Sequence, residues 1–177
     1  NIPPVVEIFS ADAAEGGYVY TRAGKLSALT SNRRQSRAIL GALSFAGKRV
    51  VDLGCGDGTY TLEFVTLAGA ASVVGVDPAQ GAIAHAEQLL RKRSVANVSF
   101  LQASIDDFAP DAPFDVAVLR GVLHHMDNPE AAIAKALQIA RQVVILEPNG
   151  LNVILKLIEK LSPYHRRHGE RSFLPAT

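Results

Sequence analysis

The sequence contains a single cysteine, Cys55, among its 177 residues. An internal disulfide needs two cysteines, so a disulfide-stabilised scaffold is excluded, and one free cysteine is typical of a reducing compartment. The chain also lacks any apolar run near the roughly 18 residues that a membrane-spanning helix needs. Its N-terminus lacks the basic and then apolar pattern of a secretory signal. These absences predict a soluble domain in the cytoplasm.

The chain lacks a strong net charge as well, because 18 Lys and Arg residues nearly balance 17 Asp and Glu residues. The distribution is less even, since every charged residue between Gly16 and Val51 is basic, and a second basic group lies at residues 165–171. Each group is either a solvated surface or a site that attracts an anionic acceptor, such as a phosphorylated metabolite, an acidic glycan or RNA. No aromatic residues alternate with these charges to stack bases, so a nucleic acid is the less favoured partner.

Buried strands and amphipathic helices are predicted to alternate along most of the chain. Short apolar runs predict strands at residues 49–53, 72–77, 98–103, 114–119 and 142–148. Helical spacing predicts helices at residues 31–46 and 61–70, after Pro78, from the cap Asn128 through Ala140, and at residues 151–161. The strands are apolar throughout, so we expect an α/β fold with a doubly wound, mostly parallel sheet and helices on both faces.

The stretch VVDLGCGDGTYT, residues 50–61, places three glycines directly after the first predicted strand. Such a loop aims backbone N–H groups at a ligand and removes the side chains that would block it. Thr59 stands where a dinucleotide-binding motif has its third glycine, and the Asp52 carboxylate would repel a pyrophosphate but attract an ammonium group. Asp77, which ends the second strand, has the position of an acid that binds ribose hydroxyls. A ribose, an ammonium group and no phosphate together describe S-adenosylmethionine.

These stretches resemble the motifs of class I S-adenosylmethionine-dependent methyltransferases, in particular the group of ubiquinone and menaquinone biosynthesis enzymes and many small-molecule methyltransferases. VVDLGCGDGTYT is similar to their first motif, and VVGVDPAQGAI resembles the second-strand motif with its ribose-binding acid. FDVAVLRGVLHHMDNPEAAI is similar to the fourth-strand segment, and ARQVVILEPNG to the fifth strand. The resemblance covers roughly residues 35–150. It implies S-adenosylmethionine as cofactor, S-adenosylhomocysteine as product and a small-molecule methyl acceptor.

The resemblance also implies a role for each matching position. Asp77 would bind the ribose, Pro78 would pack on the adenine, and Asp52 would lie near the methionine amino group. The family often has an acid after the third strand that meets the adenine, but this chain has Ala103 and Ser104 there. The adenine contact therefore stays open among Ser104, Ile105 and Asp106. The implied cofactor-binding residues are Asp52, Gly54, Cys55, Gly56, Asp57, Gly58, Asp77, Pro78, Ser104, Ile105, Asp106, Arg120 and Gly121.

Two histidines follow the fourth strand and are the catalytic candidates. A hydroxyl acceptor needs a base for its proton, and histidine titrates near neutral pH. His124 and His125 have the required position, and His125 is the preferred one of the two. The alternative is that one of them packs or caps the loop before Asn128, because the LHH stretch occurs in relatives of differing chemistry. A metal site formed by both histidines with Asp127 is less favoured, since adjacent histidines usually point in different directions.

We expect three parts in the chain: an N-terminal lid segment at residues 1–34, a cofactor-binding core at residues 35–150, and a C-terminal helix with a basic tail at residues 151–177. Lid segments cover the cofactor in related enzymes, which makes Tyr18, Tyr20 and Arg22 candidates for closing the site.

The resemblance implies a sheet of seven strands, and we expect the last two to be lacking after the fifth strand. We therefore expect an uncovered sheet edge through which two copies pair. Two alternatives to small-molecule methylation stay open, namely RNA methylation and a cofactor-binding module without activity of its own.

Overall fold

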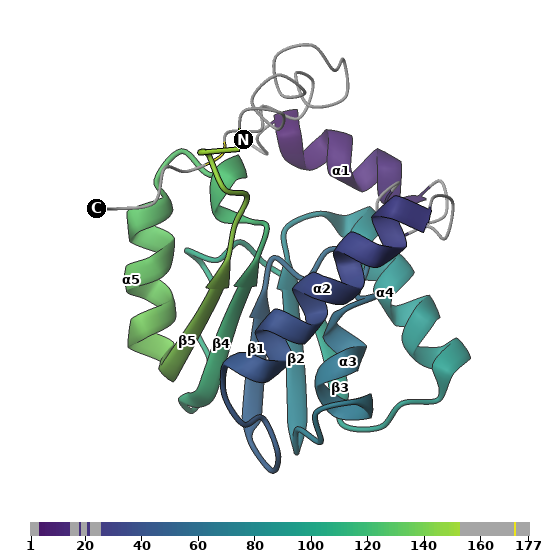
Figure 1. Cartoon of the computed structure of the whole chain (residues 1–177), viewed down its shortest axis with the longest axis vertical. Coiled ribbons are helices and arrows are strands. Elements are labelled where there is room, and N and C mark those ends of the chain that lie inside the picture. Colours follow the sequence, from purple (N-terminus) through teal and green to yellow (C-terminus); the bar gives the residue numbers. More distant parts are fainter. Residues whose placement is uncertain (1–3, 15–17, 19–20, 22–25, 153–171, 173–177) are drawn as a thin grey trace.

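A computed structural model of the chain describes residues 4–14, 18, 21, 26–152 and 172. Within them five parallel strands form one sheet in the order β3-β2-β1-β4-β5 (Figure 1). The strands are β1 (Arg49–Leu53), β2 (Ser72–Asp77), β3 (Val98–Gln102), β4 (Phe114–Arg120) and β5 (Ala140–Leu146). The helices are α1 (Pro4–Ala14), α2 (Leu26–Ala42), α3 (Thr61–Thr66), α4 (Gln80–Arg93), α5 (Pro129–Ile139) and the short 3-10 helix η1 (Leu123–His125). The predicted α/β fold with a parallel sheet is confirmed.

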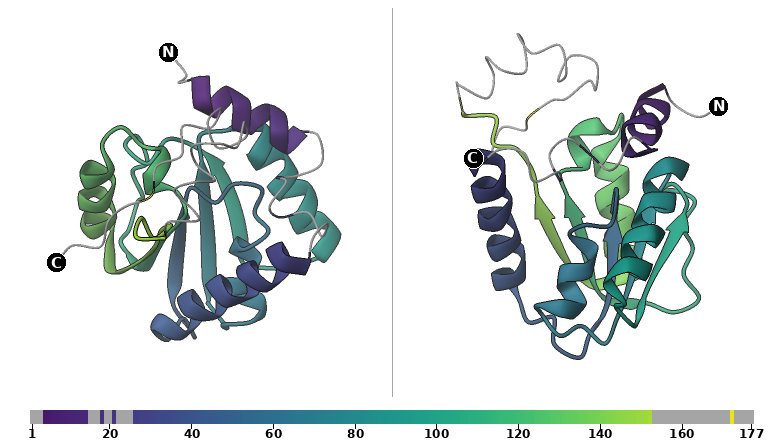
Figure 2. Two further views of the ribbon diagram at one scale, coloured as in Figure 1. Left: turned by 45° about the horizontal axis from the view of Figure 1, so that its top comes forward. Right: turned by 90° about the vertical axis from the view of Figure 1, so that its right-hand side faces the viewer.

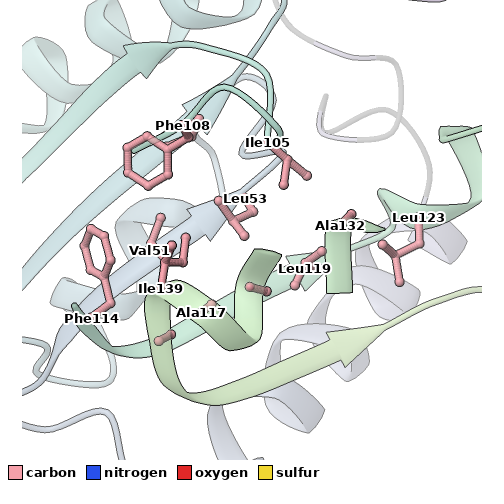
Figure 3. Close-up of a cluster of buried hydrophobic side chains, with 13 residues drawn as sticks. Val51, Leu53, Ile105, Phe108, Phe114, Ala117, Leu119, Leu123, Ala132 and Ile139 are labelled. Carbon is pink, nitrogen blue, oxygen red and sulfur yellow. The ribbon is translucent and has the colours of Figure 1, made fainter. Parts of the chain in front are cut away.

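Helices cover both faces of the sheet, as the packing of buried side chains shows. On one face α2 and α3 contribute Ile39 and Phe64, which pack with Val50 of β1 and Val116 of β4. On the other face α5 and the turn after β3 pack against β1 and β4, and most side chains of that cluster are labelled in Figure 3. Because both faces are buried, β1 and β4 carry apolar residues almost continuously rather than at every second position.

Several element boundaries match the sequence prediction closely. β1 and β2 occupy residues 49–53 and 72–77, as predicted. Asn128 is the N-cap of α5, since its side-chain oxygen accepts a hydrogen bond from the N–H of Ala131 at 3.0 Å. Pro129 follows at the first helical position, where its missing N–H costs nothing.

Other boundaries differ from the prediction. Ala140 was predicted to lie on the helix after Asn128, and this is wrong, because Ala140 begins β5 and pairs with Phe114 of β4. The helix predicted for residues 61–70 ends at Thr66, and Gly69 adopts a left-handed backbone with φ of 68° in the turn that follows. The helix predicted for residues 31–46 lies earlier, at Leu26–Ala42. Of the helix predicted for residues 151–161, all but the first two residues lie outside the described residues.

α1 lies at the end of the sheet to which the strand arrows point, beside α4 (Figures 1 and 2). One contact between these two helices is a hydrogen bond from the N–H of Gly81 to Oγ of Ser10, at 2.8 Å. α1 thus packs beside the loops that leave the sheet. No helix within the described ranges is both long enough and apolar enough for a membrane crossing.

Candidate functional site

The strand order changes direction between β1 and β4, since β2 and β3 continue to one side and β5 to the other. The carboxyl ends of the strands beside such a point form the crevice in which open α/β sheets bind ligands. The loop after β1 at residues 54–60, the turn after β2 and the loop after β4 all begin there. Half of the predicted site residues lie on these three segments, and Asp52, Asp77 and Arg120 lie in the strands that precede them.

Asp77, at the end of β2, holds the glycine loop by its carboxylate. Oδ2 accepts a hydrogen bond from the N–H of Gly56, and Oδ1 accepts one from the N–H of Ala79, both at 2.9 Å. Burial raises the pKa of Asp77, and these two N–H donors partly oppose that effect. Each carboxylate oxygen has two lone pairs, so with the partners found among the described residues one acceptor site remains on each oxygen for a ligand hydroxyl.

Asp52, in β1, is a buried carboxylate with little local compensation. Its Oδ2 accepts a hydrogen bond from the Thr61 hydroxyl at 2.7 Å. Burial raises the pKa of Asp52 to about 6, although the Thr61 bond and the positive charge of Arg120 act against the shift. The neighbouring carboxylates of Asp77 and Glu63 raise it further. Negative charge is therefore concentrated at the carboxyl end of β1 and β2, which favours a ligand with a positive charge.

Asp57, in the glycine loop, binds the N-terminal segment. Its Oδ2 accepts hydrogen bonds from the backbone N–H of Tyr18, at 3.1 Å, and from the hydroxyl of Thr21. Oδ1 accepts a third bond, from the N–H of Thr59 at 3.1 Å. Gly56 has a left-handed φ of 55°, and a Cβ built on it would lie 2.6 Å from the Tyr18 ring. Tyr18 therefore packs on the loop, while Tyr20 and Arg22, predicted beside it, lie outside the described residues.

The other predicted loop residues lie in close packing. A Cβ on Gly54 would meet the Val122 side chain of the loop after β4 at 2.3 Å, and a Cβ on Gly58 would meet the Phe100 ring at 2.7 Å. These glycines thus allow the loop to approach two other elements. Burial raises the pKa of the Cys55 thiol well above its usual range, and the neighbouring carboxylates raise it further. This thiol stays protonated and is a poor nucleophile.

Arg120, at the end of β4, joins α2 to the site. Its guanidinium lies 3.5 Å above the ring of Tyr60 and donates hydrogen bonds to Oγ of Ser36 at 3.0 Å and to Oε1 of Gln35 at 3.3 Å. Burial raises the pKa of Tyr60 to about 12. The phenol is therefore neutral at ordinary pH, and Arg120 brings positive charge close to Asp52.

The two predicted histidines lie on η1. His124 is buried, and its Nδ1 lies 2.6 Å from Oε2 of Glu147, the residue directly after β5. The His125 ring packs against the His124 ring and against Phe9 of α1, with ring centroids 3.9 Å and 4.9 Å away. Gly121, at the start of this loop, donates its N–H to the carbonyl of Leu146 at 2.8 Å. The histidines thus lie between β5 and the N-terminal helix.

The residues after β3 form a compact turn. Oγ of Ser104 donates to the carboxylate of Asp107 at 2.6 Å and accepts the N–H of Asp107 at 3.0 Å. Ile105 is buried in the core cluster of Figure 3. Asp106 is exposed, and its carbonyl accepts a hydrogen bond from Lys135. Ser104 and Ile105 thus stabilise this turn, and the proposed adenine contact of any of the three stays a prediction.

A groove of about 620 Å³ lies between α1 and α4. Pro78, predicted to contact the adenine, lines it together with Gln102 at the end of β3. Gln102 also donates a hydrogen bond to the carbonyl of Pro78 at 3.3 Å. The remaining lining residues are Val6, Glu7, Ser10, Ala11, Gln80, Gly81 and Ala84. The groove therefore adjoins the turn that carries Asp77.

Sequence reasoning missed three residues that form this site: Thr61, Tyr60 and Glu147. The position of Glu147 directly after an apolar strand is a signal, since such positions gather at one edge of a parallel sheet. Nothing local indicates that Thr61 bonds Asp52 or that Tyr60 lies under Arg120. Across the described ranges, no group of three or more His, Cys, Asp or Glu side chains is placed to hold a metal ion.

Comparisons with known proteins identify relatives of this chain. A family model described as a methyltransferase domain matches residues 44–164. An uncharacterised methyltransferase of Schizosaccharomyces pombe is 34% identical over 100 residues, which are 52% of this chain and 36% of that protein. A ubiquinone biosynthesis O-methyltransferase of Pseudomonas syringae is 36% identical over 92 residues, which are 51% of this chain and 38% of that protein. The matched part of the chain thus covers less than half the length of these two relatives.

The fold is shared with solved structures as well. A magnesium protoporphyrin IX methyltransferase from Synechocystis, solved with bound SAH, superposes with a TM-score of 0.68. The match covers 94% of this chain and 77% of that chain at 19% sequence identity. At this identity the match shows the fold alone.

Proposed function

This chain belongs to the methyltransferase domain family whose model covers residues 44–164, and on that premise we propose that it binds S-adenosylmethionine and transfers its methyl group to a small molecule. The observation that carries the proposal is the pairing of Asp77 with the glycine loop through the N–H of Gly56. It brings an acid with free acceptor sites beside a loop of small residues, at the point where the strand order reverses.

The charges around the loop suit this cofactor. Asp77 would accept hydrogen bonds from the two ribose hydroxyls, and Asp52 would lie near the ammonium group of the methionine part. The pKa of about 6 at Asp52 reflects burial of a carboxylate with little compensation, and a cationic ligand would supply that compensation. Pro78, Ser104, Ile105 and Asp106 are the candidates for the adenine side.

When bound, S-adenosylmethionine supplies a methyl group that its sulfonium already makes electrophilic. The protein's part is then to align the acceptor and exclude water. For a hydroxyl acceptor, His124 or His125 would take the proton, since both lie on the loop after β4 beside the proposed cofactor site.

The proposal assigns residues 1–34 as a lid, residues 35–150 as the cofactor-binding core and residues 151–177 as a C-terminal extension. Tyr18, which packs on Gly56, supports the lid, and Tyr20 and Arg22 belong to the same segment. The exposed residues Arg33, Arg34 and Arg37 of α2 support an anionic or glycan-type acceptor. The single cysteine supports a cytoplasmic location.

A second candidate function is a cofactor-binding module that acts with a partner chain. The observation in its favour is that the matched part of this chain covers only 36% and 38% of the two curated relatives. Transfer of labelled methyl groups to a metabolite extract separates the two candidates, because the module would bind S-adenosylmethionine but transfer nothing. Transfer to RNA instead would identify the third candidate, an RNA methyltransferase.

The cofactor proposal is tested by calorimetry with S-adenosylmethionine on the parent protein and on Asp77→Ala. Losing charge-assisted bonds to two hydroxyls should weaken binding by about 1.5–3 kcal/mol, or roughly 10- to 150-fold.

The matched control is Asp115→Ala. Asp115 also accepts a backbone N–H, that of Arg49 at 2.9 Å, but it lies where β4 begins, at the opposite end of the sheet. It should lower stability and leave the affinity unchanged. Equal affinity for the folded Asp77→Ala protein and its parent would remove Asp77 from the ribose site, and no binding to the parent would overturn the proposed function.

A further inference from the structure

The carboxylate of Glu147 binds three donors on the loop that carries the histidines. Oε1 accepts hydrogen bonds from the N–H groups of Val122 and Leu123, both at 2.8 Å. Oε2 lies 2.6 Å from Nδ1 of His124. The side chains of Glu147 and His124 are only 10% and 7% exposed, so these bonds are shielded from water. Glu147 therefore determines both the position of the loop and the surroundings of His124.

The chemistry of a carboxylate favours one proton arrangement in the contact with His124. An ionised carboxylate can only accept hydrogen bonds, and Nδ1 lies within bonding distance of it, so the proton between them belongs to Nδ1. A neutral imidazole carries one proton, and Nε2 is then the nitrogen with the lone pair. Within the part of the chain that the structure describes, the bond to Glu147 is the one side-chain hydrogen bond of His124.

The neighbours of His124 keep the ring in this place. A Cβ on Gly121 would lie 3.7 Å from Cε1 of His124, and the His125 ring packs on it with centroids 3.9 Å apart. His125 in turn contacts Phe9 of α1. The other two Glu147 bonds hold Val122 and Leu123, and the Val122 side chain packs against Gly54 of the glycine loop. One carboxylate thus connects β5, the histidine pair and the proposed cofactor loop.

We propose that Glu147 is a positioning residue that holds the proton of His124 on Nδ1 and leaves Nε2 as the ring nitrogen able to accept a proton. Resting on the proposed function, this inference favours His124 over His125 as the group that takes a proton from a hydroxyl acceptor. Glu147 itself does not touch the reacting atoms. Its part corresponds to the third group of a catalytic triad, which holds a histidine in the tautomer that the chemistry needs.

The test is the tautomer of His124, measured by ¹⁵N nuclear magnetic resonance at a pH where an ordinary histidine is neutral. Glu147→Gln keeps a carbonyl oxygen for the N–H groups of Val122 and Leu123, which orients its amide nitrogen toward His124. Because the amide nitrogen can only donate, Nδ1 must become the acceptor and the proton must move to Nε2. His124→Gln identifies the signals, and Glu130→Gln, which changes an exposed carboxylate in the first turn of α5, is the matched control.

We expect the Nδ1–H form in the parent protein and in Glu130→Gln, and the Nε2–H form in Glu147→Gln at nearly unchanged thermal stability. A parent spectrum with the proton on Nε2, alone or together with Nδ1, overturns the inference, and so does a tautomer that Glu147→Gln leaves unchanged. Calorimetry of the parent with S-adenosylmethionine separates the two proposals. A tautomer switch without any cofactor binding would defeat the proposed function and leave the role of Glu147 standing.

Discussion

Three buried aspartates surround the glycine loop, and each has different hydrogen-bond partners. Asp57 accepts bonds from Tyr18, Thr21 and Thr59, and Asp77 accepts two backbone N–H groups. Asp52 has the Thr61 hydroxyl as its side-chain partner within the described ranges. A buried charge with so few donors is costly, which is why the pKa of Asp52 rises to about 6.

This shift predicts a pH-dependent stability that Asp52→Asn removes. The pKa of Asp52 is about 6 in the folded protein, against an ordinary value of 3.8 for an aspartate, so folding favours the protonated form. The stabilising contribution is complete below about pH 4 and is lost as the pH rises through about 6. The asparagine stays neutral, so the variant should gain stability over the parent across that window, reaching on the order of 3 kcal/mol at neutral pH. Urea unfolding at a series of pH values measures the difference.

A difference that stays constant with pH would show that Asp52 ionises as an ordinary surface carboxylate. Measuring the affinity for S-adenosylmethionine at the same pH values tests the proposed position of its ammonium group. If its ammonium group lies beside Asp52, the affinity of the parent rises with pH through about 6, and the affinity of Asp52→Asn does not.

At the scale of elements, the glycine loop and the N-terminal segment hold each other in place. Asp57 binds the backbone of Tyr18, while the Tyr18 ring fills the space that a side chain on Gly56 would need. α1 adds the packing of Phe9 against Tyr18, with ring centroids 5.5 Å apart. The Tyr18 ring thus covers the loop at Gly56, which supports the proposed lid role of the N-terminal segment.

Gly56→Ala tests the packing of Tyr18 on the glycine loop, and Gly47→Ala is the matched control. Both glycines are left-handed, with φ of 55° and 69°, but a Cβ on Gly47 meets nothing within 4 Å. Gly47→Ala should therefore carry only the backbone strain, about 1–2 kcal/mol of unfolding free energy. Gly56→Ala should in addition displace Tyr18. It should weaken the binding of S-adenosylmethionine at least about 10-fold, or about 1.4 kcal/mol. Thermal unfolding and calorimetry measure the two effects.

Equal losses of stability in the two variants, with equal affinities, would contradict the close contact between Tyr18 and the loop. A loss of affinity in Gly47→Ala would show that the assay reports general destabilisation.

At the scale of the whole molecule, β5 is an edge of the sheet within the described residues. Ile145 of β5 is 42% exposed and Leu137 of the adjoining helix α5 is 61% exposed. Open strand edges favour pairing between chains, and a two-fold axis would bring two β5 strands together in antiparallel fashion. We therefore propose a homodimer through this edge.

Ile145→Lys should dissociate such a dimer, because charged side chains on edge strands oppose pairing. Leu67→Lys is the control, since Leu67 is 70% exposed next to α3, away from β5. Sedimentation analysis should find dimers for the parent and for Leu67→Lys, and monomers for Ile145→Lys. A monomeric parent protein would exclude the dimer, and a dimeric Ile145→Lys would place the interface elsewhere.

The sequence by itself determined most of the fold, because strand and helix signals are local. The apolar runs at residues 49–53 and 72–77 became β1 and β2, and Asn128 followed by Pro129 became the start of α5. The same locality explains the error at Ala140. Alanine suits a helix, and only its pairing with Phe114, on a strand 26 residues earlier in the chain, makes it the first residue of β5.

The candidate site was determined partly by local sequence patterns and partly by the tertiary structure. The glycine loop and Asp77 were evident from their spacing, because a strand end followed by glycines is a local pattern. Their partners were decided only by the tertiary structure: Asp57 meets Tyr18 across 39 residues, and Glu147 meets His124 across 23. Helical and strand periodicities extend over a few residues, so they cannot indicate which distant side chains the sheet order brings together. The tautomer of His124 depends on such a contact, and it follows from the strand order that places β5 beside β4.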